Sequence, residues 1–562
     1  MRKSISRSAL VGTAVVLAVV LSACGAGKKS GGTSAPAGSN QPSVSESSTT
    51  TGGNSGAAPL SKSLTVGTTD QVVAVDPAGS YDFGSTMIEV QIYQYLMAVP
   101  AGGKTPVPDA AKSCGFKDPH TYECTMKPGL KFSNGDPLTA KDVAFTFQRV
   151  VKINNPNGPA SLLANMKSVS APNDSTVVFK LNNPNDQTWP YVLGTSAGPI
   201  VDSKVFPADK LLPDADCIGS GPYKLQTYNK NQQVTFAENP NYTGPNKAKT
   251  PTVTLRYYTE SSNLKLDIQS NNIDVAYRSL TPTDITSLAS DSNVKVLKGA
   301  GGELRYMVFN LKTMPGNTDA QKLAIRRAMA YSINRDQLAT DVYKGTYQPA
   351  YSMVPNGVNG ATKPFAQVYG TQPNVAKAKQ ELQQAGVQTP VDLNIEYNTD
   401  HYGSTSTQEY GAVKQQLEAT GLFKVTLSSA LYTVYAVDRT KDKYPIYQLG
   451  WFPDFPDADN YLAPFLVPNN FVAAHYCDPD ATDRPCDKDG VLPLLAKEES
   501  STGNTRAQAL AQIQMKLATG TMPFLPLLSG YQVAVTGTNV SGVQETLDPS
   551  YLFRMWMISK TD

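Results

Sequence analysis

Histidine, cysteine and charged residues are all scarce in this chain of 562 residues. There are three histidines and six cysteines, and 17% of the residues are charged. Three scattered histidines are a thin supply for a metal centre. The 49 basic and 47 acidic side chains nearly cancel, and no basic patch is evident. The composition therefore argues against nucleic acid as a partner.

Long apolar runs are absent after the first twenty residues, so no later segment is expected to cross a membrane. The one such run, Ala9 to Val20, follows Arg2, Lys3 and Arg7. A basic start, a short apolar core and small residues at a cleavage point are typical of a secretory signal, and the run is too short to span a bilayer. We therefore expect a signal peptide over residues 1–23.

The end of this signal carries a candidate lipid-attachment site. Leu21-Ser22-Ala23-Cys24 resembles the lipobox of bacterial lipoproteins, which is cut before the cysteine and diacylated on its sulfur. An ordinary signal peptide with an incidental cysteine is the alternative. Residues 24–61 are almost entirely Gly, Ser, Thr, Ala, Pro and Asn, a composition that buries too little apolar surface to fold. We expect a disordered tether with a reach on the order of 35 Å, anchored to the outer face of the cell membrane.

The remaining cysteines favour disulfide bonds. In the oxidising exterior that an export signal implies, Cys114 and Cys124 lie close enough in sequence for a local bond, as do Cys477 and Cys486, which leaves Cys217 over. The gaps within the two pairs are wider than the spacing of zinc knuckles. We expect two disulfides, no metal site and no cofactor.

About 500 residues remain after the tether, which is more than one hydrophobic core normally organises, so two or three domains are expected. Alternating patterns predict strands at 63–67, 252–258 and 304–310 and hairpins at 114–124 and 223–237. Amphipathic helices are expected after the caps Thr139 and Thr318, another is expected to start near Asn374, and a further one carries Leu510, Ile513 and Leu517. Strands and helices mixed without a strict βαβ rhythm indicate an α/β fold with insertions.

Four stretches stand out as a set. They are KPGLKFSNGDPLTAKDV at 127–143, IGSGPY at 218–223, Phe309-Asn310 with IRRAMAYSINR at 325–335, and GWFPDFPDADNY at 450–461. In this order they resemble the peptide-binding branch of the family 5 solute-binding proteins, which feed ABC importers. Ser220 and Ala458 stand where the family commonly has threonine and proline, and both changes are conservative.

The resemblance implies a two-lobed α/β fold of the periplasmic-binding-protein type (type II, large cluster, with an extra subdomain), whose ligand is buried where the lobes close. Mapped onto this chain, lobe I covers residues 62–303 and 525–562 and contains an inserted subdomain at about 95–215. Lobe II covers residues 304–524. The chain would cross between them near Glu303-Leu304-Arg305 and Phe524-Leu525-Pro526, and these crossings would form a hinge.

The resemblance also implies a ligand site. It places the acid that binds a peptide ammonium at Asp454 and an apolar wall at Trp451, and it turns the loop Tyr81–Thr86 toward the cleft. Six residues are therefore candidate ligand contacts: Tyr81, Phe83, Ser85, Tyr306, Trp451 and Asp454. The aromatic candidates could instead be core residues, and the 450–461 run a solvated turn. No basic residue is singled out to bind a peptide carboxylate, so ligand length stays open.

Two stretches of the sequence partly match the motifs of other protein classes. Gly194–Gly198 matches the G-x-S-x-G motif of serine hydrolases, but that motif needs a strand before it and a helix after it, and Pro199–Asp202 gives no amphipathic helix. Placing Gly490 at the EF-hand glycine puts Pro485 and Ala496 where carboxylates are needed. We therefore expect neither an enzyme nor a calcium site.

The sequence predicts a monomeric, lipid-anchored extracytoplasmic protein that captures peptides and delivers them to the permease of an ABC transporter, whose ATPase is a separate protein. A binder of a metal complex or another small solute, for import or for signalling, is the alternative. A secreted serine hydrolase is the alternative from another class.

Overall fold

The computed structural model describes residues 59–468, 472–477, 487 and 489–562. The expected signal peptide, Cys24, Cys486 and nearly all of the expected tether lie outside the described residues. Within these ranges, no helix is both long enough and apolar enough to cross a bilayer.

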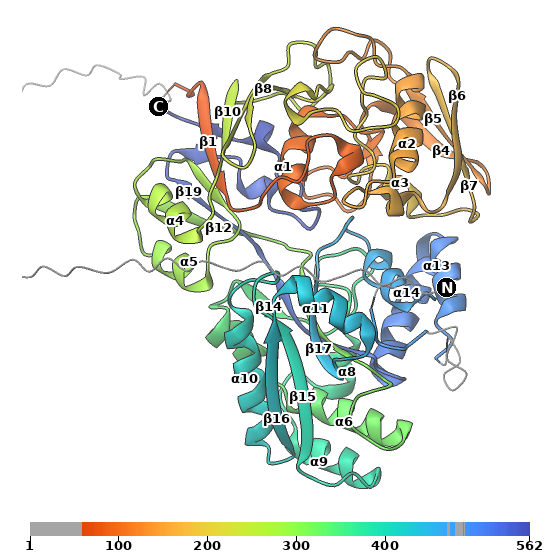
Figure 1. The fold of residues 1–562 in the computed structure, drawn as a ribbon, viewed down its shortest axis with the longest axis vertical. Coiled ribbons are helices and arrows are strands. Elements are labelled where there is room, and N and C mark those ends of the chain that lie inside the picture. Colours follow the sequence, from red (N-terminus) through yellow and green to blue (C-terminus); the bar gives the residue numbers. More distant parts are fainter. Residues whose placement is uncertain (1–58, 469–471, 478–486, 488) are drawn as a thin grey trace, which may run out of the picture. The chain divides into compact units, whose positions relative to one another are not determined.

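A seven-stranded sheet is built mainly from the first half of the chain (Figure 1). Its strands, in spatial order, are β12 (Val294–Gly299), β19 (Gln532–Gly537), β11 (Val275–Tyr277), β1 (Ser63–Thr68), β10 (Thr252–Tyr257), β9 (Gln233–Glu238) and β8 (Tyr223–Asn229). The strand expected at 63–67 and the hairpin expected at 223–237 are confirmed. β1 lies at the centre, parallel to β10 and β11, and its alternate residues Leu64 and Val66 are buried.

A six-stranded sheet is built from the second half of the chain. Its strands, in spatial order, are β14 (Tyr347–Pro349), β18 (Phe524–Gly530), β13 (Leu304–Phe309), β17 (Ile446–Trp451), β15 (Val391–Asn398) and β16 (Phe423–Ala430). Every residue of β13 and β18 is buried. Such near-continuous apolar burial is typical of strands covered on both faces.

The chain passes between the two sheets twice. The first passage joins β12 to β13 through residues 300–303, and the second joins β18 to β19 through Tyr531. The backbone N–H of Gly530 donates to the carbonyl of Glu303 at 3.0 Å, so the two passages lie side by side. The second passage comes later than the expected Phe524–Pro526, because the buried run from Phe524 to Gly530 is a strand of the six-stranded sheet.

A separate four-stranded antiparallel sheet falls inside the expected subdomain. Its order is β4 (Ala111–Asp118), β5 (Thr121–Met126), β7 (Thr176–Leu181) and β6 (Met166–Asn173). Cys114 and Cys124 lie opposite each other on β4 and β5 and form the expected disulfide. Cys477 is also disulfide-bonded, while Cys217 is free and buried.

The expected helix starts are confirmed. Thr139 forms a capping box with Asp142 at the start of α2 (Ala140–Ile153). The side chain of Thr318 caps α6 (Asp319–Ser332), and that of Asn374 caps α9 (Val375–Gln384). In each case a side-chain oxygen accepts from a backbone N–H that has no partner within its helix. The helix carrying Leu510, Ile513 and Leu517 is α14 (Gly503–Thr519), and these three residues are buried.

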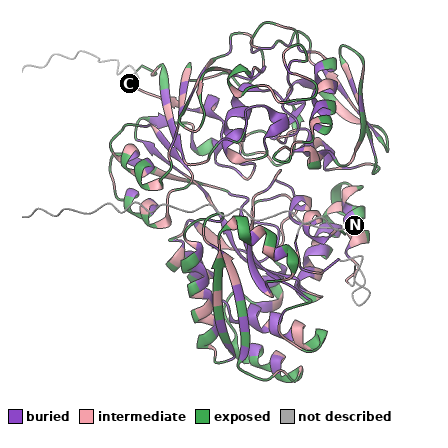
Figure 2. Ribbon diagram, viewed as in Figure 1, coloured by how far each residue is buried: buried purple, intermediate pink, exposed green. Residues whose placement is uncertain are grey.

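The remaining elements are shorter or cover the sheets, and Figure 2 shows their burial. They are α1 (Phe83–Ile92), α3 (Trp189–Val192), α4 (Ser261–Gln269), α5 (Pro282–Leu288), α7 (Arg335–Gln337), α8 (Pro364–Tyr369), α10 (Ser406–Ala419), α11 (Tyr432–Asp438), α12 (Ala463–Leu466), α13 (Leu492–Glu499), β2 (Met97–Ala98), β3 (Val107–Pro108), β20 (Val540–Ser541) and β21 (Ser559–Lys560). Separate hydrophobic clusters lie against the seven-, six- and four-stranded sheets.

Candidate ligand-binding site

Two adjoining cavities are lined by residues from both halves of the fold. The first, called here the Asp454 cavity, has a volume of about 360 Å³. The second, the Glu303 cavity, has a volume of about 730 Å³. Four residues line both: His401, Tyr402, Phe452 and Tyr551. Both volumes fall in the range of small-molecule binding pockets.

Asp454 lies in the loop that follows β17, and other side chains fix its carboxylate. One carboxylate oxygen accepts from the Tyr81 hydroxyl. The other accepts from Nδ2 of Asn460 at 2.9 Å, and Oδ1 of Asn460 accepts from the backbone N–H of Asp454 at 2.8 Å. Burial raises the pKa of Asp454, although these hydrogen bonds oppose the shift. The result is an oriented carboxylate at the cavity wall with no basic partner among its hydrogen bonds.

Tyr81 and Phe83 reach the Asp454 cavity from the start of α1. Contrary to the expectation from the sequence, residues Tyr81–Thr86 are not a loop throughout, because Asp82 caps a helix that begins at Phe83. The Asp82 carboxylate accepts from the N–H of Ser85 at 2.9 Å. The Phe83 ring contacts the rings of Phe452 and Tyr551, with centroids 5.1 and 5.6 Å away. The Phe83–Phe452 pair joins α1 to the loop that carries Asp454.

The walls of the Asp454 cavity are rich in aromatic rings. Trp451 lines the cavity, packs edge-on against Phe465 at 5.0 Å, and donates through Nε1 to Asn460 at 3.2 Å. On another side, His401 and Tyr432 stack with their ring centroids 3.7 Å apart. Burial lowers the pKa of His401, so its ring is neutral near pH 7. Flat rings around a carboxylate suit a cation that carries apolar groups.

Two of the six candidate contacts lie elsewhere. Ser85 is fully buried, and its hydroxyl donates to Asp82 and accepts from the N–H groups of Val73 and Ala74. Tyr306 is fully buried in the core of the six-stranded sheet, where it packs against Phe465 and Phe524. Neither residue lines the two cavities. Tyr81, Phe83, Trp451 and Asp454 do line the Asp454 cavity together.

Ser196 of the G-x-S-x-G stretch also lines the Asp454 cavity, a position that sequence analysis did not anticipate. Its Oγ lies 3.4 Å from Oγ1 of Thr86. The element before the stretch is the short helix α3, and no regular element follows at 199–202. A nucleophile elbow requires a strand and then a helix, so the stretch is a polar part of the cavity wall.

Asp457 and Asn460 position the Asp454 loop without lining the cavities. The guanidinium of Arg506 on α14 donates two hydrogen bonds to the Asp457 carboxylate, at 2.6 and 2.8 Å. Asp457 also accepts from the N–H of Asp459 at 3.0 Å, as expected for a loop fixed by its own backbone. Asn460, which orients Asp454, was not predicted from the sequence. The only available signal was its place in the 450–461 run.

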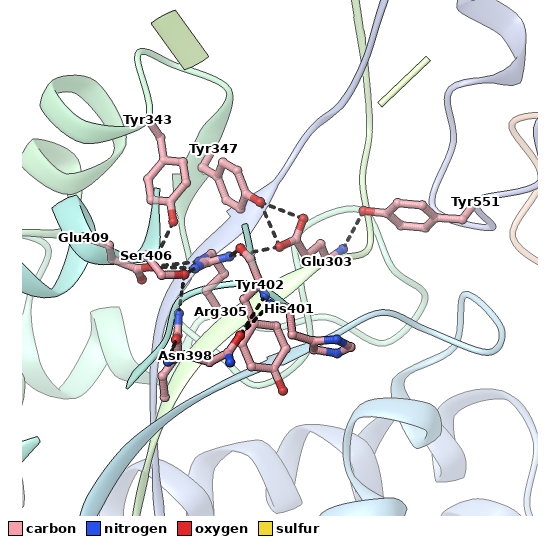
Figure 3. A network of polar contacts seen from close by, with 11 residues as sticks. Glu303, Arg305, Tyr343, Tyr347, Asn398, His401, Tyr402, Ser406, Glu409 and Tyr551 are labelled. Carbon is pink, nitrogen blue, oxygen red and sulfur yellow. Dashed lines mark hydrogen bonds and ion pairs between the residues drawn. The ribbon is translucent and has the colours of Figure 1, made fainter. Parts of the chain in front are cut away.

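A buried polar network forms part of the Glu303 cavity wall (Figure 3). Arg305 is almost fully buried, and its guanidinium lies 2.8 Å from Oε2 of Glu409 and 3.5 Å from Oε1 of Glu303. The Tyr347 hydroxyl contacts both oxygens of Glu303, at 2.7 and 2.8 Å. The Tyr343 hydroxyl donates to Glu409 at 2.8 Å. Glu303, Tyr343 and Tyr347 line the cavity.

Arg278 is the one lysine or arginine among the described residues that line the two cavities. Its Nε lies 3.1 Å from a carboxylate oxygen of Asp70. Its guanidinium carbon lies over the rings of Phe83, Phe452 and Tyr551, at 4.3, 5.1 and 5.6 Å from their centroids. Arg278 could not be singled out from the sequence, because it lies in no recognisable motif and reaches the cavity only through the fold.

No group of three or more His, Cys, Asp or Glu side chains that could hold a metal ion occurs within the part of the chain that the structure describes. Within the same part, the carboxylates of Asp454, Glu303 and Asp70 are bonded to tyrosine, asparagine or arginine. The EF-hand alternative at 485–496 falls partly outside the described residues.

Two sheets joined by two adjacent chain passages, with ligand-sized cavities lined from both, define a two-lobed solute-binding protein of the α/β class. The family model for bacterial extracellular solute-binding proteins, family 5 (Middle), matches residues 105–472, and the chain belongs to that family. The members of the family are binding proteins rather than enzymes. The expected family and fold class are therefore confirmed.

Relatives found by sequence agree with this assignment, and solved structures share the fold. The oligopeptide-binding protein OppA of Bacillus subtilis (strain 168) is 24% identical over 96% of each chain. The MppA periplasmic murein tripeptide binding protein, in its unliganded open form, has a TM-score of 0.74 at 18% identity and covers 90% of this chain and 98% of its own. DppA from Helicobacter pylori, in complex with the peptide STSA, has a TM-score of 0.69 at 20% identity and covers 90% and 99%.

Proposed function

We propose that this protein is a lipid-anchored receptor on the outer face of the cell membrane that captures peptides and delivers them to an ABC permease, with a separate ATPase supplying the energy. The family assignment supports an extracellular binding role. The peptide ligand is supported by the names of the relatives, an oligopeptide-binding protein among them. The anchor rests on the Leu21–Cys24 lipobox, and the protein acts as a monomer.

The oriented carboxylate of Asp454 is the observation that carries the peptide proposal. A peptide ammonium taken out of water is costly unless it meets a carboxylate with good geometry. Asp454 is held in place by Asn460 and Tyr81, and the rings of Trp451 and Phe83 lie along the same cavity. The ammonium therefore pairs with Asp454 while the first side chain packs against aromatic walls that accept many shapes.

The experiment is isothermal titration of the purified protein with alanine peptides of two to six residues. Each peptide is tested with a free and with an acetylated amino terminus. We expect heat of binding for the free peptides and at least a tenfold weaker affinity for the acetylated ones, since an unpaired buried carboxylate costs more than about 1.4 kcal/mol. Equal affinity for both forms would show that the ammonium is not recognised.

The same titration separates the peptide proposal from its alternative. If no peptide binds while a metal complex or another small solute does, the protein is a receptor for that solute. Delivery to a permease is tested in cells, where deleting the permease of the proposed ABC transporter should abolish uptake of the bound peptide. Continued uptake without it would contradict the import role and favour signalling.

A further inference from the structure

The buried network beside the Glu303 cavity contains more negative than positive charge. Glu303 and Glu409 contribute two carboxylates, and Arg305 contributes the single guanidinium between them. Glu409 is completely buried, Arg305 is 1% exposed and Glu303 is 8% exposed. Buried charges are normally compensated by partners because low polarisability makes an isolated charge costly. This network is one positive charge short.

The neighbouring charged pair does not supply that charge. Arg278 and Asp70, at 3.1 Å, have opposite charges that cancel. One oxygen of Glu409, Oε1, is buried and accepts no hydrogen bond from any described residue. Each oxygen of a carboxylate can accept two hydrogen bonds, so the network has unused acceptor capacity as well as excess negative charge.

Glu303 is the carboxylate through which this network meets the cavity. It lines the 730 Å³ space, whereas Glu409 and Arg305 do not. Oε2 of Glu303 accepts only from the Tyr347 hydroxyl, at 2.7 Å, among the described residues. Figure 3 shows Tyr347 and Tyr551 on either side of Glu303, and the backbone N–H of Glu303 donates to the Tyr551 hydroxyl at 3.0 Å. These contacts fix the position of Glu303 at the passage between the two sheets.

The rest of the lining of the Glu303 cavity also favours a positively charged ligand. Asp70, Glu260 and Asp400 line it along with Glu303, against the single cation Arg278, which is paired with Asp70. The neutral ring of His401 adds no positive charge. The cavity adjoins the Asp454 cavity through Phe452 and Tyr551, so one ligand can occupy both.

We propose that the Glu303 cavity binds a cationic side chain of the ligand, with the Glu303 carboxylate as its acceptor, so that the preferred ligands are peptides with a lysine or arginine after the first residue. This inference rests on the proposed function. The ammonium of the ligand pairs with Asp454, its basic side chain supplies the charge that the buried network lacks, and an acidic side chain in the same place is repelled.

The test compares three tetra-alanine peptides in which one residue after the first is replaced by lysine, by norleucine or by glutamate. Norleucine matches the length of the lysine side chain without its charge. Substitution is made at the second, third and fourth positions in turn, and affinities are measured by titration calorimetry. We expect the best lysine peptide to bind at least about tenfold more tightly than its norleucine match, and the glutamate peptide to bind most weakly.

Glu303→Gln then assigns the effect to one residue. The amide keeps an acceptor for the Tyr347 hydroxyl but removes the charge, so the preference for lysine over norleucine should fall to about twofold or less, with norleucine binding retained. Glu260→Gln, on an exposed acid of the same cavity, is the matched control and should keep most of the preference.

The outcomes separate this inference from the function on which it rests. Equal binding of lysine and norleucine peptides by the unaltered protein overturns the inference and leaves peptide capture intact. A lysine preference that survives in Glu303→Gln also overturns it. If none of the three peptides binds, the proposed function fails and the inference fails with it. Should Glu303→Gln not fold, the comparison of peptides on the unaltered protein decides alone.

Discussion

At the scale of single residues, the candidate site depends on side chains that orient other side chains. Asp454 is the proposed partner of the ligand, but Asn460 fixes its direction and the Tyr81 hydroxyl donates to one of its oxygens. A ligand ammonium must therefore use the remaining acceptor capacity of Asp454 or displace the Tyr81 hydroxyl. Since Tyr81 belongs to the first half of the fold and Asp454 to the second, this contact also joins the two.

Replacing Asp454 by asparagine should weaken binding of peptides with free amino termini by roughly 2–5 kcal/mol, the range for removing one partner of a buried charge pair. Acetylated peptides should lose much less, because they bring no ammonium. Titration calorimetry on both peptide forms measures the difference. Tyr81→Phe is the control, because it removes a hydrogen bond from Asp454 and keeps the charge, so the preference for free termini should remain. Equal losses for both peptide forms in Asp454→Asn would contradict the assigned role.

At the scale of elements, local sequence signals and long-range pairing contribute in different ways. Thr139, Thr318 and Asn374 start helices where the sequence predicts them, because a cap acts within four residues of itself. The β4–β5 hairpin is likewise local, with its two cysteines directly opposite. The strand β18 was not predicted, since its partner β13 lies more than 200 residues earlier and Pro526 within it argues against a central strand. A register shift in β13 beside Pro526 accommodates it.

Replacing both Cys114 and Cys124 by serine should destabilise the four-stranded sheet by about 2–3 kcal/mol, the value that the chain-entropy model gives for a short loop. Urea unfolding without reductant, followed by circular dichroism, measures the difference. The double variant is preferred to reduction of the unaltered protein, because reductant would also break the bond at Cys477. Unfolding free energies that agree within error would show that the bond contributes nothing.

At the scale of the whole molecule, the subdomain and the second half of the fold meet at Glu499, the last residue of α13. Its carboxylate accepts from Asn183 at 3.1 Å, and its backbone carbonyl accepts from the N–H of Gln187 at 2.8 Å. Burial, together with the nearby charge of Asp186, raises the pKa of Glu499 to about 7. Folding therefore favours the protonated form of the Glu499 carboxyl group over the ionised form, compared with the unfolded chain.

Because the folded pKa of Glu499 lies above its usual value of 4.5, its contribution to the free energy of unfolding is fully present below about pH 4.5 and is lost as the pH rises through about 7. Glu499→Gln has no group to titrate there. The thermal midpoint of the unaltered protein should therefore fall relative to that of the variant between these pH values. Calorimetric scans at a series of pH values measure both. A difference between the two midpoints that does not change with pH would contradict the assignment.

The sequence by itself determined the family and the local elements, because motif runs, caps and hairpin alternation depend on neighbours in the chain. The 450–461 run pointed to Asp454 and Trp451, which do line one cavity. Only the tertiary structure decided which other residues join them. Arg278, Glu303 and Ser196 reach the cavities from separate elements, whereas Ser85 and Tyr306 turn into the interior. The direction of a side chain depends on how distant strands pair, and a local sequence pattern does not predict that pairing.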